Sequence, residues 1–141
     1  PTMISPRSSR LIKMEISANP EYVSIIRLTT SGIANKVGFC LDDIEDLKVA
    51  ISEACTNAIK HSLEDRFTII YTMIEKGLTI EIIDNGKGYN TKEVSEPDLD
   101  NLKESGMGLF IIESLMDEVN VESTEGKGTS IKMTKYLGVD M

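Results

Sequence analysis

Two polar side chains, Glu53 and Asn57, lie four positions apart in a stretch whose apolar residues recur at helical spacing. On a helix this spacing puts both side chains on one face, about 6 Å apart along the axis, so they can share one site. A carboxylate there can accept a proton from a hydroxyl group, and an amide oxygen can bind Mg²⁺, which prefers oxygen ligands. The pair alone also fits a solvated helix face, so its meaning depends on the motifs that follow.

A second group of candidates, Asp84, Gly86 and Gly88, occurs in a turn sequence directly after the strand-like run 78–83. A carboxylate at the end of a strand is suited to accept a hydrogen bond from the exocyclic amine of adenine. This residue would therefore recognise a base and not phosphates. The alternative is a simple Asx turn, which the sequence Asp-Asn-Gly forms without any ligand.

The third motif, Gly106-Met107-Gly108-Leu109-Phe110, stands at the expected start of an apolar helix. The free N–H groups and the positive dipole end of a helix can receive an anionic phosphate, and glycine lets the backbone approach closely. The alternative is an ordinary flexible loop that enters a helix. The motif follows a long polar segment that can fold over a bound nucleotide, which favours the phosphate site.

Two further residues are candidates for supporting roles. Lys60 lies one turn beyond Asn57 and can help to neutralise phosphate, although a solvated lysine fits equally well. Thr129 begins the last strand, where its hydroxyl can reach Asp84 or the base through a water, although threonine is also a good strand residue. Together with the three motifs, they predict a binding site for ATP and Mg²⁺.

The elements that must position these residues can be read from periodicity and turn signals. A short strand over residues 11–16 precedes a helix that starts at Asn19-Pro20 and ends near Gly38. A second helix is expected to begin at Asp42, where Glu45 completes a capping box.

The second half of the chain reads as two hairpins separated by a loop and a helix. The hairpins are expected at 67–74 with 78–83 and at 119–123 with 129–133, and the helix at 108–118. The polar segment 89–105 is expected to be a lid loop. The fold class is therefore α+β: a two-layer sandwich in which a mostly antiparallel sheet is covered on one face by three helices.

Composition limits the class of protein. A chain of 141 residues fits one domain, and we expect residues 11–141 to form it, after a flexible segment 1–10. The net charge of −8, from 23 acidic and 15 basic residues, argues against binding of DNA or RNA. Two cysteines, no secretory pattern and no long apolar span predict a cytoplasmic protein with reduced thiols and no membrane contact.

The order Glu53-x-x-x-Asn57, Asp84-x-Gly86-x-Gly88, Gly106-x-Gly108 and Gly128-Thr129 resembles the ATPase superfamily of gyrase, histidine kinases and MutL, which shares the Bergerat ATP-binding fold. Within it, residues 52–58 and 106–119 resemble the RsbW-type anti-sigma factor serine kinases of bacteria. The resemblance covers residues 11–136.

This resemblance implies a partner switch. A member of the family sequesters a sigma factor and uses Mg-ATP to phosphorylate a serine of an anti-anti-sigma protein, and members similar to this chain are homodimers. Glu53 would be the general base, Asn57 the Mg²⁺ ligand and Asp84 the reader of adenine.

By the same resemblance, Gly86 and Gly88 would line the base pocket, and residues 106–110 would hold phosphates beneath the lid. Two alternatives stay open: an ATP-binding anti-sigma module that transfers no phosphate, and a stand-alone ATPase domain detached from a larger machine.

Overall fold

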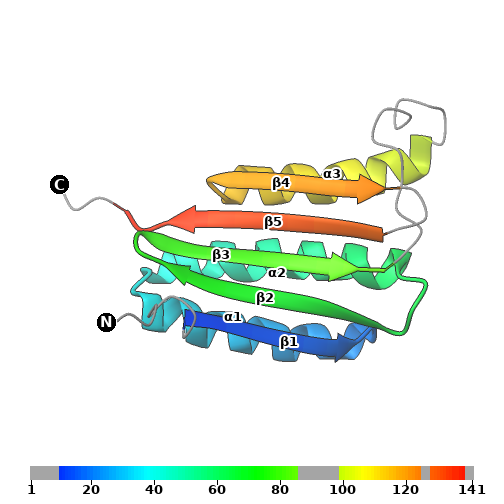
Figure 1. Cartoon of the computed structure of the whole chain (residues 1–141). Coiled ribbons are helices and arrows are strands. Elements are labelled where there is room, and N and C mark those ends of the chain that lie inside the picture. The colour runs from blue at the N-terminus through cyan, green and yellow to red at the C-terminus, as the bar shows by residue number, and fades with distance from the viewer. Residues whose placement is uncertain (1–9, 86–98, 125–127, 139–141) are drawn as a thin grey trace.

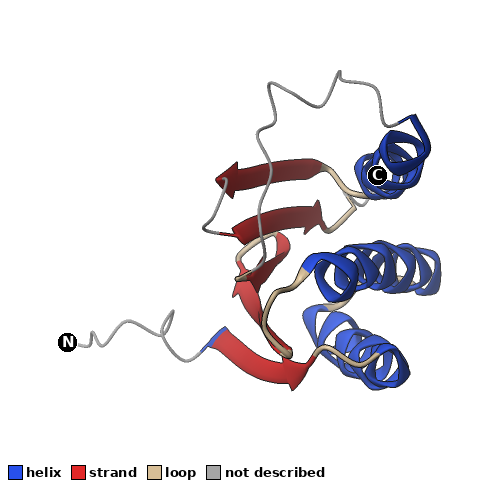
Figure 2. Cartoon of the chain, turned by 90° about the vertical axis from the view of Figure 1, so that its right-hand side faces the viewer, coloured by secondary structure: helices blue, strands red, loops and turns tan. Residues whose placement is uncertain are grey.

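The computed structural model describes residues 10–85, 99–124 and 128–138. It has an antiparallel five-stranded sheet with the strand order β1-β2-β3-β5-β4, and three α-helices cover one of its faces (Figures 1 and 2). This architecture confirms the expected α+β class. In chain order the elements are β1 Leu11–Ser17, the short helix η2 Pro20–Tyr22, α1 Val23–Val37, α2 Leu41–His61, β2 Arg66–Ile74, β3 Gly77–Asp84, α3 Leu99–Leu115, β4 Glu118–Thr124 and β5 Gly128–Tyr136.

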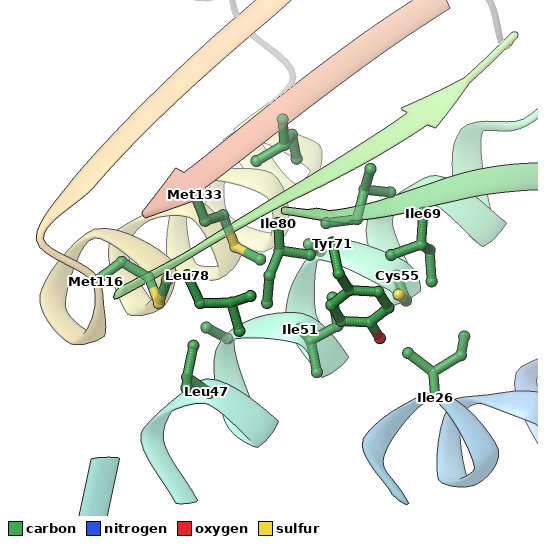
Figure 3. Packing of buried hydrophobic residues seen from close by; sticks show 14 of the residues in the cluster. Ile26, Leu47, Ile51, Cys55, Ile69, Tyr71, Leu78, Ile80, Met116 and Met133 are labelled. Carbon is green, nitrogen blue, oxygen red and sulfur yellow. The ribbon is translucent and has the colours of Figure 1, made fainter. Parts of the chain in front are cut away.

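The sheet follows from a row of apolar residues at every second position of its central strands. Ile69 and Tyr71 of β2 lie opposite Ile82 and Ile80 of β3, and Ile80 pairs in turn with Met133 of β5. All five side chains are buried. Because side chains on a strand alternate between faces, these positions form one apolar surface on which the helices pack (Figure 3).

The start and end of α1 confirm the expected signals. The Asn19 side chain accepts a hydrogen bond from the N–H of Glu21 at 2.9 Å, and Pro20 opens the short helix η2 that leads into α1. Gly38 ends α1 with a φ of 110°, in the left-handed region that favours glycine, and its N–H bonds the carbonyl of Ala34 at 3.1 Å.

The expected start of α2 is wrong by a residue, and so is its cap. The helix begins at Leu41, and the cap position is Cys40, whose side chain makes no capping hydrogen bond. Asp42 therefore lies inside the first turn with Asp43, where carboxylates still interact favourably with the helix dipole. The pattern of Asp42 and Glu45 resembles a cap because acidic residues are favoured both at the cap and in the first turn.

The largest difference concerns α3. The sequence predicts a loop to residue 105 and a helix over 108–118, but the helix spans Leu99–Leu115, so residues 99–105 are helical. Interior glycines cost about 1 kcal/mol each relative to alanine, so Gly106 and Gly108 read as a break. Packing of α3 along α2 overrides this preference. Residues 89–98 of the expected lid and residues 1–9 of the expected flexible segment lie outside the described residues.

Candidate functional site

The centre of the candidate site is the contact between α2 and α3. A methyl group added at Gly108 of α3 would lie 3.3 Å from Asn57 Nδ2, 3.8 Å from Asn57 Oδ1 and 3.4 Å from Glu53 Oε2. Both polar side chains are half-buried, and Gly108 is buried. The helix therefore places Glu53 and Asn57 on one face, as expected, and the glycine brings the backbone of α3 against their polar ends.

A second set of residues lies where β3 and β5 meet. Asp84 is the last residue of β3, is only 6% exposed, and pairs in register with Thr129 of β5. Alternation along β3 puts its side chain on the same face as Ile80 and Ile82, which is the face that the helices cover. A carboxylate is thus held at the helix side of the sheet, beside the hydroxyl of Thr129.

Two features of β5 support this placement of Asp84 and Thr129. Gly128 has a φ of 95°, and a Cβ there would lie 2.1 Å from the Asp84 carbonyl oxygen, so only glycine fits. The hydroxyls of Thr129 and Ser123 are 2.9 Å apart, which links β5 to β4. Thr129 therefore has a fixed neighbour on the side away from Asp84.

The two sets lie at one end of the molecule. In Figure 1 the carboxyl ends of α2 and β3 point toward the same side, where the first turns of α3 also lie. The last turn of α2 adds the basic residues Lys60 and His61, both exposed. A ligand with a base and several phosphates can thus contact carboxylate, amide and cation groups from elements far apart in sequence.

The structure changes one part of the expected site. Residues 106–110 lie inside α3 and not ahead of it, so the helix end with free N–H groups belongs to the turn that begins at Leu99. Met107 and Phe110 are 62% and 70% exposed, and Leu109 is half-buried. Of this motif, the structure brings Gly108 to Glu53 and Asn57. Gly86 and Gly88 lie outside the described residues.

Sequence reasoning missed Ser123 and Lys135. Ser123 is a polar residue on the side of β4 that also carries Val119 and Val121, and this break in the alternation was the available signal. Lys135 is a lysine on the covered side of β5, only 8% exposed, at a position where the strand pattern calls for an apolar residue. Buried lysines are rare unless they are paired.

The donor set suits a Mg-nucleotide. Within the described part of the chain, no three His, Cys, Asp or Glu side chains come together in a way that could hold a metal ion. Mg²⁺ bound with a nucleotide takes its other ligands from phosphates and waters and needs only one or two protein oxygens, which the Asn57 amide oxygen can provide. No helix among the described residues is long and apolar enough to cross a membrane.

The chain is similar to proteins of a known family. Residues 16–135 match the family model described as the histidine kinase-like ATPase domain. The serine-protein kinase RsbW of Bacillus velezensis is 41% identical over 138 residues, covering 89% of this chain and 85% of the relative. The enzyme of the same name from Bacillus cereus is 42% identical, covering 89% and 84%.

Solved structures share the fold. The RsbU and RsbW domains of a Mycobacterium tuberculosis protein superpose with a TM-score of 0.69 at 19% identity, over 92% of this chain but only 33% of that longer chain. The histidine kinase domain of a blue-light activated kinase from Erythrobacter litoralis gives a TM-score of 0.54 at 19% identity, over 86% of this chain and 62% of the other. The chain therefore belongs to the histidine kinase-like ATPase family and, within it, to the RsbW serine-protein kinases.

Proposed function

We propose that this protein is an anti-sigma factor with serine-protein kinase activity, which sequesters a sigma factor and phosphorylates a serine of an anti-anti-sigma protein. The observation that carries the proposal is the contact of Gly108 with Glu53 and Asn57, 3.3–3.4 Å from a methyl group at that glycine. A carboxylate and an amide are thus held together against the backbone of a glycine in α3. The relatives at 41–42% identity are named serine-protein kinases.

In this site Glu53 is the general base. It accepts the proton of the serine hydroxyl while the serine oxygen forms its bond to the γ-phosphorus, and the bond from that phosphorus to the β–γ bridging oxygen breaks to release ADP. Bound Mg²⁺ offsets negative charge on the phosphates and holds them in place. Asn57 provides the amide oxygen that orients the ion, and Lys60 contributes positive charge at the same end of α2.

The base half of the nucleotide lies at the sheet. Asp84 accepts the hydrogen bond from the adenine amine, and Thr129 contacts the base or Asp84 through a water. By the family resemblance, we assign Gly86 and Gly88, which lie outside the described residues, to the base pocket, and residues 106–110 to the phosphates. The placement of Asp84 supports the assignment, because its carboxylate is 6% exposed at the end of β3, on the helix side of the sheet.

The partners we propose are proteins: a sigma factor, an anti-anti-sigma protein with an acceptor serine, and a second copy of this chain in a homodimer. The net charge of −8 favours partners with basic surfaces over nucleic acid. We place the protein in the cytoplasm, where sigma factors act.

The test is transfer of labelled γ-phosphate from Mg-ATP to a cognate anti-anti-sigma protein, comparing wild type with Glu53→Gln. We expect the substitution to reduce labelling of the serine by about 10²- to 10⁴-fold, the usual contribution of a general base, with ATP binding retained. Glu45→Gln, an exposed carboxylate two turns earlier on α2, is the matched control and should label like wild type.

Equal labelling by Glu53→Gln would remove Glu53 from the role of base. Binding of ATP and of a sigma factor by the wild type, without any serine label, would instead identify a sequestering module that transfers no phosphate. Steady hydrolysis of ATP with no protein acceptor would identify a stand-alone ATPase.

A further inference from the structure

Lys135 makes a buried connection among three elements. It lies on the helix side of β5, opposite Leu78, and is 8% exposed. Its Nζ donates a hydrogen bond to the carbonyl oxygen of Leu115 at 2.6 Å, and lies 4.0 Å from both Asp43 Oδ1 and Asp46 Oδ2. Buried lysines are rare unless they are paired, and this one has both carboxylate and carbonyl partners.

The charges of both helices match this cation. Leu115 is the last residue of α3, where unpaired carbonyls give the helix its negative end. Asp43 lies in the first turn of α2, and Asp46 follows one turn later. One ammonium group therefore bonds a carbonyl at the end of α3 and lies within ion-pair distance of two carboxylates of α2, so it links both helices to β5.

Neighbouring bonds hold the segment after α3 to the same strand. The N–H of Asp117 bonds the carbonyl of Thr134 at 2.9 Å, and the Asp117 carboxylate accepts a hydrogen bond from the N–H of Tyr136 at 2.7 Å. These bonds fix residue 117 to the sheet but do not reach α2. Among the hydrogen bonds and ion pairs of the described residues at this end, those of Lys135 link α3 to α2, in addition to the apolar packing between the two helices.

The same two helices form the candidate site farther along their length. They run in opposite directions side by side (Figure 1). Gly108 precedes Leu115 by seven residues, and Glu53 follows Asp46 by seven, so each is about 10 Å from the Lys135 contact along its helix. A shift of α3 along α2 at the Lys135 end therefore displaces Gly108 relative to Glu53 and Asn57.

We propose that Lys135 is a positioning residue for phosphoryl transfer: it fixes the position of α3 along α2 and thereby holds Gly108 against Glu53 and Asn57. It contacts neither nucleotide nor acceptor serine. The proposal rests on the proposed kinase function for its catalytic consequence, whereas its structural consequence, the placement of Gly108, can be measured without activity.

The test compares Lys135→Met, which keeps the aliphatic stem, with Lys135→Arg, which keeps a cation. Because a small misplacement caused far from the reacting atoms can cost up to about 100-fold, we expect Lys135→Met to lower kcat by about 10- to 100-fold. Binding of ADP, measured by calorimetry, should change by less than about 3-fold, since the base contacts at Asp84 are not moved. Lys135→Arg should restore most of kcat. Lys132→Met, an exposed lysine on the opposite face of β5, is the matched control.

Hydrogen exchange gives a second readout that does not need activity. Lys135→Met should speed exchange of the amides of residues 106–110, and Lys132→Met should not. If Lys135→Met does not fold, the pair Asp43→Asn with Asp46→Asn should produce the same pattern more weakly. Faster exchange confined to residues 112–117, or an unchanged kcat in a destabilised Lys135→Met, would overturn the proposal. A wild type that transfers no phosphate would refute the kinase function, and the exchange result would still decide the role of Lys135.

Discussion

Two helix contacts in this protein differ in what they bury. Where α1 meets β2, Thr30 and Tyr71 are fully buried, and their hydroxyls lie 2.7 Å apart in a hydrogen bond. The Thr30 hydroxyl also lies 2.8 Å from the carbonyl of Ile26, and Cys55 and Ile51 surround the ring (Figure 3). Where α2 meets α3, a carboxylate and an amide are only half-buried and face a glycine.

The two contacts therefore have different consequences: one matters for the stability of the fold and the other for binding a ligand. A fully buried contact with satisfied polar groups fixes one packing arrangement, and changes there alter the free energy of unfolding. A contact in which polar side chains face bare backbone contributes less packing but offers groups to a ligand. We therefore expect substitutions at the α1–β2 contact to change stability with little effect on phosphotransfer. Substitutions at the α2–α3 contact should change the rate of phosphotransfer with little effect on stability.

Alkaline pH should give the largest effect, and it should come from the α1–β2 contact. Burial raises the pKa of Tyr71 from 10.0 to about 12 and the pKa of Cys55 from 9.0 to about 12. Both groups are neutral when protonated, so the stability they contribute is complete below about pH 9 and is lost as the pH rises toward 12. Each tenfold change in proton affinity corresponds to about 1.4 kcal/mol, so the total loss of unfolding free energy is several kcal/mol.

Urea denaturation at a series of pH values measures this loss. Tyr71→Phe combined with Cys55→Ala should reduce the slope of stability against pH, even if the double variant is less stable at neutral pH. A stability that stays constant up to about pH 11 would show that these groups titrate normally, contrary to their burial.

Asn57→Ala should reduce phosphotransfer by about 100-fold or more, because loss of an outer-shell partner of a metal site already costs 10- to 100-fold. The residue is half-buried at the end of α2, so the free energy of unfolding should change by less than about 1 kcal/mol. Thr56→Ala, the exposed neighbour, is the control for both measurements. A variant that keeps full Mg²⁺-dependent labelling would exclude Asn57 as the ligand.

Gly108→Ala should show most clearly that stability and the rate of phosphotransfer change independently. The new methyl would lie 3.3–3.4 Å from Asn57 and Glu53, which forces both side chains to move by a few tenths of an ångström, and we expect about 10-fold slower transfer. Alanine in a helix interior is about 1 kcal/mol more favourable than glycine, so thermal unfolding should occur at the same temperature or higher.

The matched control is Gly32→Ala in α1, where a methyl meets no atom within 4 Å. It should gain the same stability from helix propensity with no change in transfer rate. Equal rates for the two alanine variants would mean that the space at Gly108 is not used by the reaction.

Tyr71→Phe should have the smallest effect. It removes one buried hydrogen bond but leaves the Thr30 hydroxyl bonded to the carbonyl of Ile26, so we expect a loss of about 1 kcal/mol of unfolding free energy. The rate of phosphotransfer, measured at a temperature where the variant is folded, should stay within about 2-fold of wild type. A large fall in rate would show that the α1–β2 contact affects phosphotransfer as well as stability.

Much of the fold could be predicted because its signals are local. Alternation predicts β2 and β3 to within a residue at each end, and Pro20 and Gly38 mark the ends of the first helical segment. The pairing of Glu53 with Asn57 is predictable for the same reason, since helical spacing alone puts them on one face.

The wrong predictions concern the ends of α3, which depend on residues distant in the sequence. The helix expected to run to residue 118 ends at Leu115, where the Lys135 ammonium, the Thr134 carbonyl and the Asp117 carboxylate fix the turn into β4. Its start at Leu99 likewise depends on packing against α2, which outweighs the low helix propensity of Gly106 and Gly108. The contacts of Lys135 span three elements, so a pattern within one segment of the sequence does not predict them.

The central claim is that the face of α2 bearing Glu53 and Asn57, together with Gly108 of α3, binds a Mg-nucleotide. Titration of Mg-ATP into isotopically labelled protein, followed by nuclear magnetic resonance, tests it residue by residue. We predict that the side-chain amide of Asn57 and the backbone amide of Gly108 shift with one saturating curve, and that chelation of Mg²⁺ reduces the shift of Asn57. Saturable binding that leaves both signals in place, or no binding by folded protein, would contradict the account.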